Sequence, residues 1–238
     1  MSAARALAVA RPELPAGLIA IPVRTPLVRP GDDPVDVVER AVTGISRPGD
    51  VIALSETALA IAQGEFVVAE HIRPSKLAYT LARRAGALAT MSQPESVQLV
   101  IDRVGWWHVV YATFAQVLGR LTGRPGGFYR VLGEAISTID GYTGTMPPFE
   151  RAIVLAPRNP DAFSQSVFER LQVECTVVDA NDLEKAKVLG ASPGVDRRGI
   201  ERALLDNPHG NGDEQTPVVV LKWRGAGANP LLASALHE

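Results

Sequence analysis

The alternation of short β-like runs with stretches of helical periodicity constrains the fold of this chain more than any other feature. Six runs are rich in Val and Ile and are bounded by Gly or Pro, a pattern typical of strands. They cover residues 17–23, 50–55, 66–69, 151–156, 173–179 and 217–223. This alternation predicts an α/β or α+β architecture of mixed sheets with packed helices, and it excludes a helical bundle and a β-sandwich.

Helix start signals precede the stretches of helical periodicity between these runs. Each signal is a polar side chain that can accept a hydrogen bond from a free backbone N–H of the first turn. In chain order they are Asp33 before 34–45, Ser75 before 76–85, Ser92 or Gln93 before a helix that runs to Arg103, and Asn159 before 161–171.

The composition is that of a soluble globular protein. With 238 residues, 46% of them hydrophobic and 21% charged, the chain can bury a substantial core. We expect either one domain over residues 1–238 or two closely packed lobes, about 1–118 and 128–238, with residues 1–15 as a flexible tail. The net charge of −2 argues against a nucleic-acid partner.

The single cysteine and the hydrophobic pattern bear on location. Cys175 cannot form an intrachain disulfide, which fits a reducing cytosol, and its apolar neighbours predict a buried structural thiol. The apolar run 104–118 is shorter than the roughly 20 residues that cross a bilayer, so we expect a buried or dimer-interface helix. No segment is typical of a targeting signal. The expected location is the cytoplasm, without a membrane partner.

One glycine-rich turn, residues 139–148, combines an acid with groups that can approach a ligand closely. It holds Asp140, two threonines and two glycines ahead of a Pro-Pro pair. Glycine lets backbone N–H groups come close to a phosphate, and a carboxylate supplies the oxygen that divalent cations prefer. The turn is either a cation or phosphate site at Asp140 or a solvated turn in which the acid bonds its own backbone.

Acids also follow the strand expected at residues 173–179. Asp179 and Asp182 would lie at the C-terminal end of that strand, where ligands usually bind in α/β sheets. Together with Asp140 they would form an oxygen site for Mg²⁺ or Mn²⁺. The alternative is that Asp179 or Asp182 caps a helix that starts near residue 183.

Two further segments carry polar groups that could meet a nucleotide. The loop 207–217 contains Glu214, and it either wraps a nucleotide or metal or is a solvated turn. Arg24 follows the first expected strand, where it could hold a phosphate through two hydrogen bonds or simply be a surface arginine. The chain has no P-loop, no dinucleotide-binding glycine motif and no Cys/His zinc spacing.

A series of short motifs follows one order along about two-thirds of the chain. They are residues 19–28, Gly31-Asp32-Asp33, 48–52, Ala62-Gln63-Gly64, Pro74-Ser75, 137–143, 158–162, 177–182 and 217–225. In this order they resemble the coenzyme F-420-0:L-glutamate (γ-glutamyl) ligase family. The resemblance implies that family's fold and a homodimer.

The resemblance also implies an activity, that of a GTP- and divalent-metal-dependent amide ligase which joins L-glutamate to a small-molecule carboxylate. It assigns Mg²⁺ or Mn²⁺ to Asp140 and to Asp179 or, with a shifted alignment, Asn181 or Asp182. Thr143 stands where a family asparagine meets the nucleotide. The expected nucleotide-binding residues are Arg24, Thr25, Thr57, Thr143 and Glu214.

The chain departs from the family pattern after the second strand. Two lysines of the family run are replaced by Thr57 and Ile61, and neither side chain can supply a positive charge to a phosphate. Glu56 would repel a phosphate unless a metal lay between them. A second hypothesis is therefore a non-catalytic relative that binds a metal, a phosphate or a partner protein.

Overall fold

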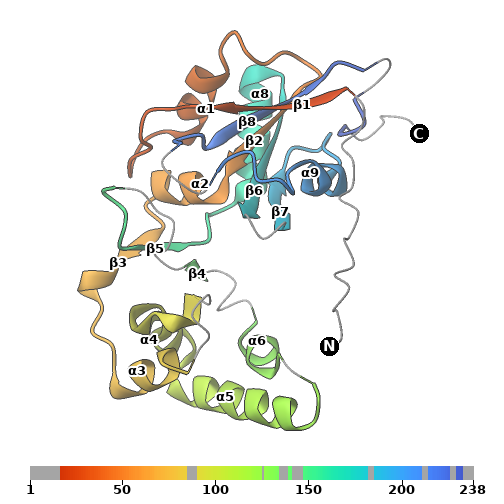
Figure 1. Cartoon of the computed structure of the whole chain (residues 1–238). Helices are drawn as coiled ribbons and strands as arrows, with labels where there is room; N and C mark the ends of the chain where they lie inside the picture. The colour runs from red at the N-terminus through yellow and green to blue at the C-terminus, as the bar shows by residue number, and fades with distance from the viewer. Residues whose placement is uncertain are drawn as a thin grey trace, which may run out of the picture.

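The computed structural model describes residues 17–84, 90–124, 126–133, 139–140, 147–181, 185–210, 214–225 and 229–232. The fold is α/β, as predicted (Figure 1). A five-stranded sheet has the order β1 (Leu18–Val23), β8 (Val218–Trp223), β2 (Val51–Ser55), β6 (Glu174–Asn181) and β7 (Lys185–Ala191). A three-stranded sheet has the order β3 (Phe66–Val68), β5 (Ala152–Leu155) and β4 (Ile139–Asp140).

The helices fall into two groups. The five-stranded sheet is accompanied by α1 (Pro34–Val42), α2 (Glu56–Ala62), α8 (Pro160–Leu171) and α9 (Arg197–Ala203). The three-stranded sheet is accompanied by α3 (Lys76–Ala82), α4 (Pro94–Val104), α5 (Trp106–Leu121), α6 (Gly127–Leu132) and the 3₁₀ turns η1 (Ala69–His71) and η2 (Thr90–Ser92). We call the first group with its sheet the sheet part and the helices α3–α6 the helical part.

The strand directions bring several chain ends to one edge of the large sheet. β2 runs parallel to β6, whereas β8 is antiparallel to both β1 and β2, and β7 is antiparallel to β6. The ends of β1, β2 and β6 therefore meet the starts of β8 and β7. We call this edge of the sheet the polar edge. Segments from both halves of the chain lie there.

The central strands of the large sheet are buried on both faces. Successive side chains of a strand point to opposite sides, so Ile52 and Leu54 of β2 join one hydrophobic cluster while Val51 and Ala53 join another. The first cluster includes α1, α2 and α8, and the second includes Ile200 of α9. Sheet strands enclosed in this way account for the continuous Val- and Ile-rich runs of the sequence.

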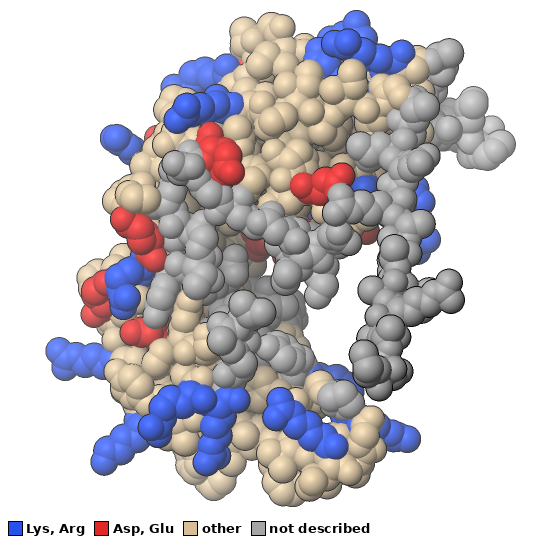
Figure 2. Space-filling view, viewed as in Figure 1, with Lys and Arg blue, Asp and Glu red and all other residues tan. Residues whose placement is uncertain are grey.

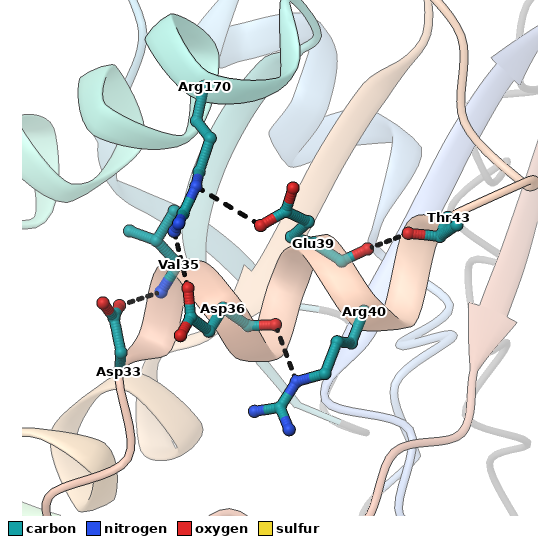
Figure 3. A network of polar contacts seen from close by, with 7 residues as sticks. All are labelled: Asp33, Val35, Asp36, Glu39, Arg40, Thr43 and Arg170. Carbon is teal, nitrogen blue, oxygen red and sulfur yellow. Dashed lines mark hydrogen bonds and ion pairs between the residues drawn. The ribbon is translucent and has the colours of Figure 1, made fainter.

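A network of charges fixes α1 against α8 (Figure 3). Asp33 caps α1 as predicted, because its Oδ1 accepts a hydrogen bond from Val35 N at 2.8 Å. Arg170 of α8 reaches across to Asp36 at 2.6 Å and to Glu39 at 3.3 Å. Both carboxylates raise the pKa of Arg170, with the Asp36 hydrogen bond as the main cause.

The other predicted caps have mixed outcomes. Ser75 caps α3 through its hydroxyl, as expected. Gln93 is the N-cap residue of α4, but its side chain makes no capping hydrogen bond. Asn159 does precede α8, but its side chain makes no capping bond and its backbone is left-handed, with φ 47°. Asp161 Oδ1 instead accepts from Ala191 N of β7 at 2.9 Å, so this acid ties α8 to the sheet.

β7 was not predicted, and a helix that starts near residue 183 is wrong, because residues 185–191 form a strand antiparallel to β6. The sequence Lys185-Ala186-Lys187-Val188 alternates polar and apolar residues, which is the period of a half-buried strand. Ala186 and Val188 pack in the core accordingly.

The two sheets meet at α2, which contacts β6 of the large sheet and β5 of the small one. Ile61, Phe149 and Ala152 form a small buried cluster at this joint. Beside it, the Gln63 amide donates to Arg158 O at 2.9 Å and accepts from Arg158 N at 2.6 Å.

Three further sequence predictions concern the burial of Cys175, membrane-spanning helices and the division into domains. Cys175 is buried, as predicted. No helix in the described part of the chain is long and apolar enough to cross a bilayer. The division into one domain or two lobes stays a prediction, and the tail 1–15 lies outside the described residues.

Candidate functional site

The polar edge of the large sheet holds most of the residues that the sequence singles out. Arg24 and Thr25 follow β1, Thr57 follows β2 in the first turn of α2, and Asp179 lies near the end of β6. Glu214 lies just ahead of β8. Strand pairing alone brings these residues from distant points of the chain to the same edge.

Two main-chain connections build this edge around the start of β8. Thr25 N donates to Gln215 O at 2.9 Å, and Ser55 N donates to Pro217 O at 2.8 Å. The Thr25 side chain is buried, and its hydroxyl donates to Pro26 O at 2.8 Å. Arg24, in contrast, is exposed beside it. Of these two expected nucleotide contacts, Arg24 has the accessible side chain, and Thr25 helps to hold the loop.

The loop before β8 closes on a buried histidine. His209 Nδ1 lies 3.2 Å from Thr216 O, and Thr216 Oγ1 donates to His209 O at 2.5 Å. Burial lowers the pKa of His209 to about 4, against the opposing effect of the Thr216 and Pro217 carbonyls, so the ring is neutral at pH 7. The Nε2 atom is buried without a hydrogen-bond partner among the described residues.

His209 was not predicted as a site residue, because nothing in the local sequence shows which of the four scattered histidines will be buried. The nearby Gly210 has φ +72°, and a Cβ there would lie 2.7 Å from the Glu214 carboxyl carbon. The positive φ favours a glycine at this position, and the Glu214 carboxylate folds back over the loop into the space that a Cβ would occupy. The Asn-Pro-His-Gly turn was the available signal for a tight loop, though not for a buried ring.

Asp179 is the one expected metal ligand whose side chain the structure describes. It pairs in register with Lys187 of β7. Partial desolvation raises the pKa of the Asp179 carboxyl, and the charge of Lys187 acts in the opposite direction. The side chain nevertheless remains exposed. A cation already stands beside this carboxylate, which weakens its attraction for a metal ion.

The other expected ligands are placed differently. The backbone of Asp140 lies in β4, opposite Val154 of β5, and so belongs to the small sheet. Asp182 and Thr143 lie outside the described residues. Within the described residues no group of three or more His, Cys, Asp or Glu side chains could hold a metal ion. The shared metal site at Asp140 and Asp179 stays a prediction.

The two positions that lack a lysine have different environments. Thr57 is half-buried in the first turn of α2. Ile61 is only 7% exposed and packs with Phe149 and Ala152 in the joint between the two sheets. A lysine ammonium at residue 61 would have to be buried there, so in this chain the position serves packing and does not face a ligand.

Comparison with known proteins gives one family. The family model described as F420-0:Gamma-glutamyl ligase matches residues 22–120, which run from the end of β1 into the last turns of α5. Arg24, Thr25 and Thr57 lie within the match, and Asp140, Asp179 and Glu214 lie beyond it. No curated protein matches the chain. The similarity to the F420-0:gamma-glutamyl ligase family therefore covers residues 22–120, which is less than half of the chain.

Proposed function

We propose that this protein is a γ-glutamyl-ligase-like enzyme that uses GTP to join a small-molecule carboxylate to L-glutamate at the polar edge. One observation carries the proposal. Strand pairing brings Arg24 and Thr57, from the segment matched by the family model, to the same edge as Asp179 and Glu214. The carboxyl ends of strands in an α/β sheet are the usual place for a phosphate-bearing ligand.

The chemistry needs an activated carboxylate. A phosphoryl group moves from GTP to a carboxylate oxygen, and the amine of glutamate then attacks the acyl carbon and releases inorganic phosphate. Arg24 is exposed at this edge, and its planar guanidinium suits two parallel hydrogen bonds to a phosphate. We assign it to holding the transferred or terminal phosphate. The loop that His209 and Thr216 close would border the same ligand.

A divalent metal, when bound, would neutralise charge on the triphosphate. The described residues do not form a complete ligand set for it, because Asp179 stands with Lys187 beside it. Mg²⁺ or Mn²⁺ binding by Asp140, Asp179 and Asp182 remains part of the proposal to be tested, and the homodimer stays a prediction.

A second function is favoured by the environment of α2. This helix carries neither Lys nor Arg, and Ile61 is buried in the joint. With less positive charge to hold a triphosphate, the polar edge would suit a smaller phosphate or carboxylate ligand without catalysis. The chain would then be a binding relative of the ligases.

Thermal unfolding with nucleotides tests both functions, because a ligand that binds only the folded state raises Tm. We expect GTP with Mn²⁺ to raise Tm, and we expect Arg24→Ala to reduce the shift. Arg47→Ala is the matched control, because Arg47 is equally exposed but precedes β2 at the opposite edge of the sheet.

Phosphate release separates the two functions. The ligase requires release from GTP that depends on both L-glutamate and a carboxylate acceptor, with coenzyme F-420-0 as the first acceptor to try. A Tm shift with GTP or inorganic phosphate, but no release, would favour the binding relative. If neither ligand shifts Tm at saturating concentration, both functions are wrong.

A further inference from the structure

Helix α5 has two apolar faces, and only one of them is used by the fold. Val109 and Ala112 are fully buried against the rest of the helical part. Gly119 lies on the same side, where a Cβ would collide with Arg124 O at 2.4 Å, so the helix packs there through small residues. The core of the helical part is thus complete without the opposite face of α5.

The opposite face is a stripe of large apolar side chains that lie in solvent. Trp107, Tyr111, Phe114, Leu118 and Leu121 are 68%, 62%, 62%, 50% and 80% exposed. Their spacing of four, three, four and three residues puts them on one side of the helix. The stripe runs for about 21 Å at 1.5 Å per residue. Continuous exposed apolar surface of this kind marks a site of interaction.

The helical part also carries an excess of positive charge that the net charge of the chain conceals. Residues 76–132 contain seven Lys or Arg and two Asp or Glu, a formal charge of +5. The rest of the chain contains 17 Lys or Arg and 24 Asp or Glu, a formal charge of −7. Figure 2 shows Lys and Arg side chains over the helical part at the bottom of the view, and the described acids of this face lie higher.

Basic residues bracket the stripe along the chain. Arg103 precedes the start of α5, Arg120 is in its last turn, and Arg124 follows its end. Arg83 and Arg84 follow the end of α3 in the same part of the molecule. A partner that binds the stripe therefore meets an apolar surface with a positive electrostatic potential.

The apolar stripe and the positive charge together distinguish between the two simplest binding partners, a second copy of the chain and a lipid surface. A second copy of the chain docked stripe to stripe would bring two parts of charge +5 together, and juxtaposed like charges oppose association. An anionic lipid surface complements the charge, and the aromatic rings suit its interface, because Trp and Tyr favour the boundary between headgroups and acyl chains. Amphipathic helices with a basic surrounding bind such surfaces while lying flat.

We propose that α5 is a membrane-docking helix whose exposed stripe inserts shallowly into the surface of an anionic phospholipid bilayer. The stacked rings of Trp106 and Trp107, with centroids 3.7 Å apart, lie at its N-terminal end and would enter the interface there. Docking by α5 leaves the polar edge, which belongs to the sheet part, outside the contact. The inference does not depend on the proposed ligase activity.

Co-sedimentation with vesicles tests the proposal on the full chain. We expect the protein to sediment with vesicles of equal parts phosphatidylglycerol and phosphatidylcholine, to stay in solution with phosphatidylcholine alone, and to be released by high salt. Phe114→Ser with Leu121→Ser should lower the partition constant roughly tenfold or more, because two exposed apolar anchors are lost. Ile19→Ser is the apolar control, 38% exposed on β1.

Variants that remove positive charge near the stripe provide a second test of membrane docking. Arg120→Gln with Arg124→Gln should weaken binding to the anionic vesicles about tenfold, and Arg47→Gln in the sheet part should leave it unchanged. These positions are exposed, so the variants are expected to fold. A fluorescence blue shift of Trp106 and Trp107 on vesicle addition, measured in a Trp223→Phe background, would report their transfer into the interface.

Three outcomes would overturn the proposal. One is equal binding, or no binding, to anionic and neutral vesicles. Another is that the Phe114→Ser, Leu121→Ser variant binds anionic vesicles as well as the unmodified chain. The third is a dimer in solution that the same variant converts to a monomer, without vesicle binding by either form; the stripe would then be an interface between copies.

Discussion

The sheet part and the helical part bury their apolar residues in opposite ways. In the sheet part, β2 is enclosed on both faces, and the polar groups are gathered at one edge. In the helical part, α5 buries its small residues and leaves its large ones exposed. The sheet part is therefore a closed scaffold with a polar site, and the helical part has a core of its own and an unmatched apolar surface.

The difference shows that hydrophobicity alone does not report burial. Ile52 and Phe114 are both large and apolar, yet the first is fully buried and the second is 62% exposed. An exposed apolar side chain is ordinary when isolated, but a stripe of them requires another explanation. The comparison can be tested at four levels, from one buried and one exposed apolar side chain to the two surface ion pairs of Arg170.

Truncation of Ile52 and of Phe114 should give the most unequal changes in the free energy of unfolding. Ile52→Ala should lower the free energy of unfolding by about 2–5 kcal/mol, because it leaves a cavity in a packed core. Phe114→Ala should change it by less than about 0.5 kcal/mol, since that ring already lies in water. Urea denaturation measures both. An equal loss for Phe114→Ala would mean that this face of α5 is covered in solution.

The pH dependence of folding stability should differ between a variant of the buried His209 and a variant of the exposed His108 of α5. The His209 pKa is about 4 in the folded chain, against about 6.5 when unfolded. Between these values only the unfolded chain takes up the proton. The stabilisation is therefore complete above pH 6.5 and is lost as the pH falls toward 4, by up to roughly 3 kcal/mol.

His209→Gln should flatten this part of the stability profile, measured by denaturant unfolding from pH 4 to 7. His108→Gln, at an exposed histidine of α5, is the matched control. If the two variants give the same profile, the ring of His209 is hydrated in solution.

Variants at the joint between the two sheets should change the free energy of unfolding less strongly. Gln63→Ala removes two hydrogen bonds to the backbone of Arg158 and should lower the free energy of unfolding by about 1 kcal/mol. Arg158→Ala keeps those main-chain groups and loses the ion pair with Glu65 and an exposed hydrogen bond from the guanidinium to Gln63 O at 2.9 Å. Because solvent screens both contacts, this variant should cost less. Urea unfolding decides the order, and a larger loss for Arg158→Ala would contradict it.

The smallest effect is expected at the surface of the sheet part. Arg170→Ala breaks the contacts of α8 with Asp36 and Glu39, all of which are exposed (Figure 3). Because solvent and salt screen such pairs, Tm should fall slightly at low ionic strength and match the unmodified chain at 1 M NaCl. A Tm loss that persists in high salt would point to packing by the arginine stem.

Local patterns predicted much of the fold. The six Val- and Ile-rich runs are strands, and Asp33 and Ser75 cap their helices through the expected hydrogen bonds. These features depend on neighbours within about four residues, so the sequence displays them directly. β7 was missed although Lys185–Val188 alternates with the period of a strand, because an adjacent acid was taken as a helix cap.

The candidate site was predictable only in part. Arg24 and Glu214 are 190 residues apart in the sequence, and only the pairing of β1 with β8 brings their segments together. The same pairing gives no support for joining Asp140 to Asp179, since their strands belong to different sheets. The metal assignment came from the pattern of acids together with the family resemblance, and the GTP assignment came from the resemblance; both remain to be tested.

The sequence by itself determined the α/β class, most strand and helix positions, and the match of residues 22–120 to the ligase family model. These features could be predicted because periodicity, helix caps and short motifs depend on residues that are close together in the sequence. The tertiary structure decided which histidine is buried, that residue 61 packs in a joint, and which face of α5 is exposed. Those outcomes depend on segments far apart in the chain, whose contacts remove or preserve hydration at each side chain.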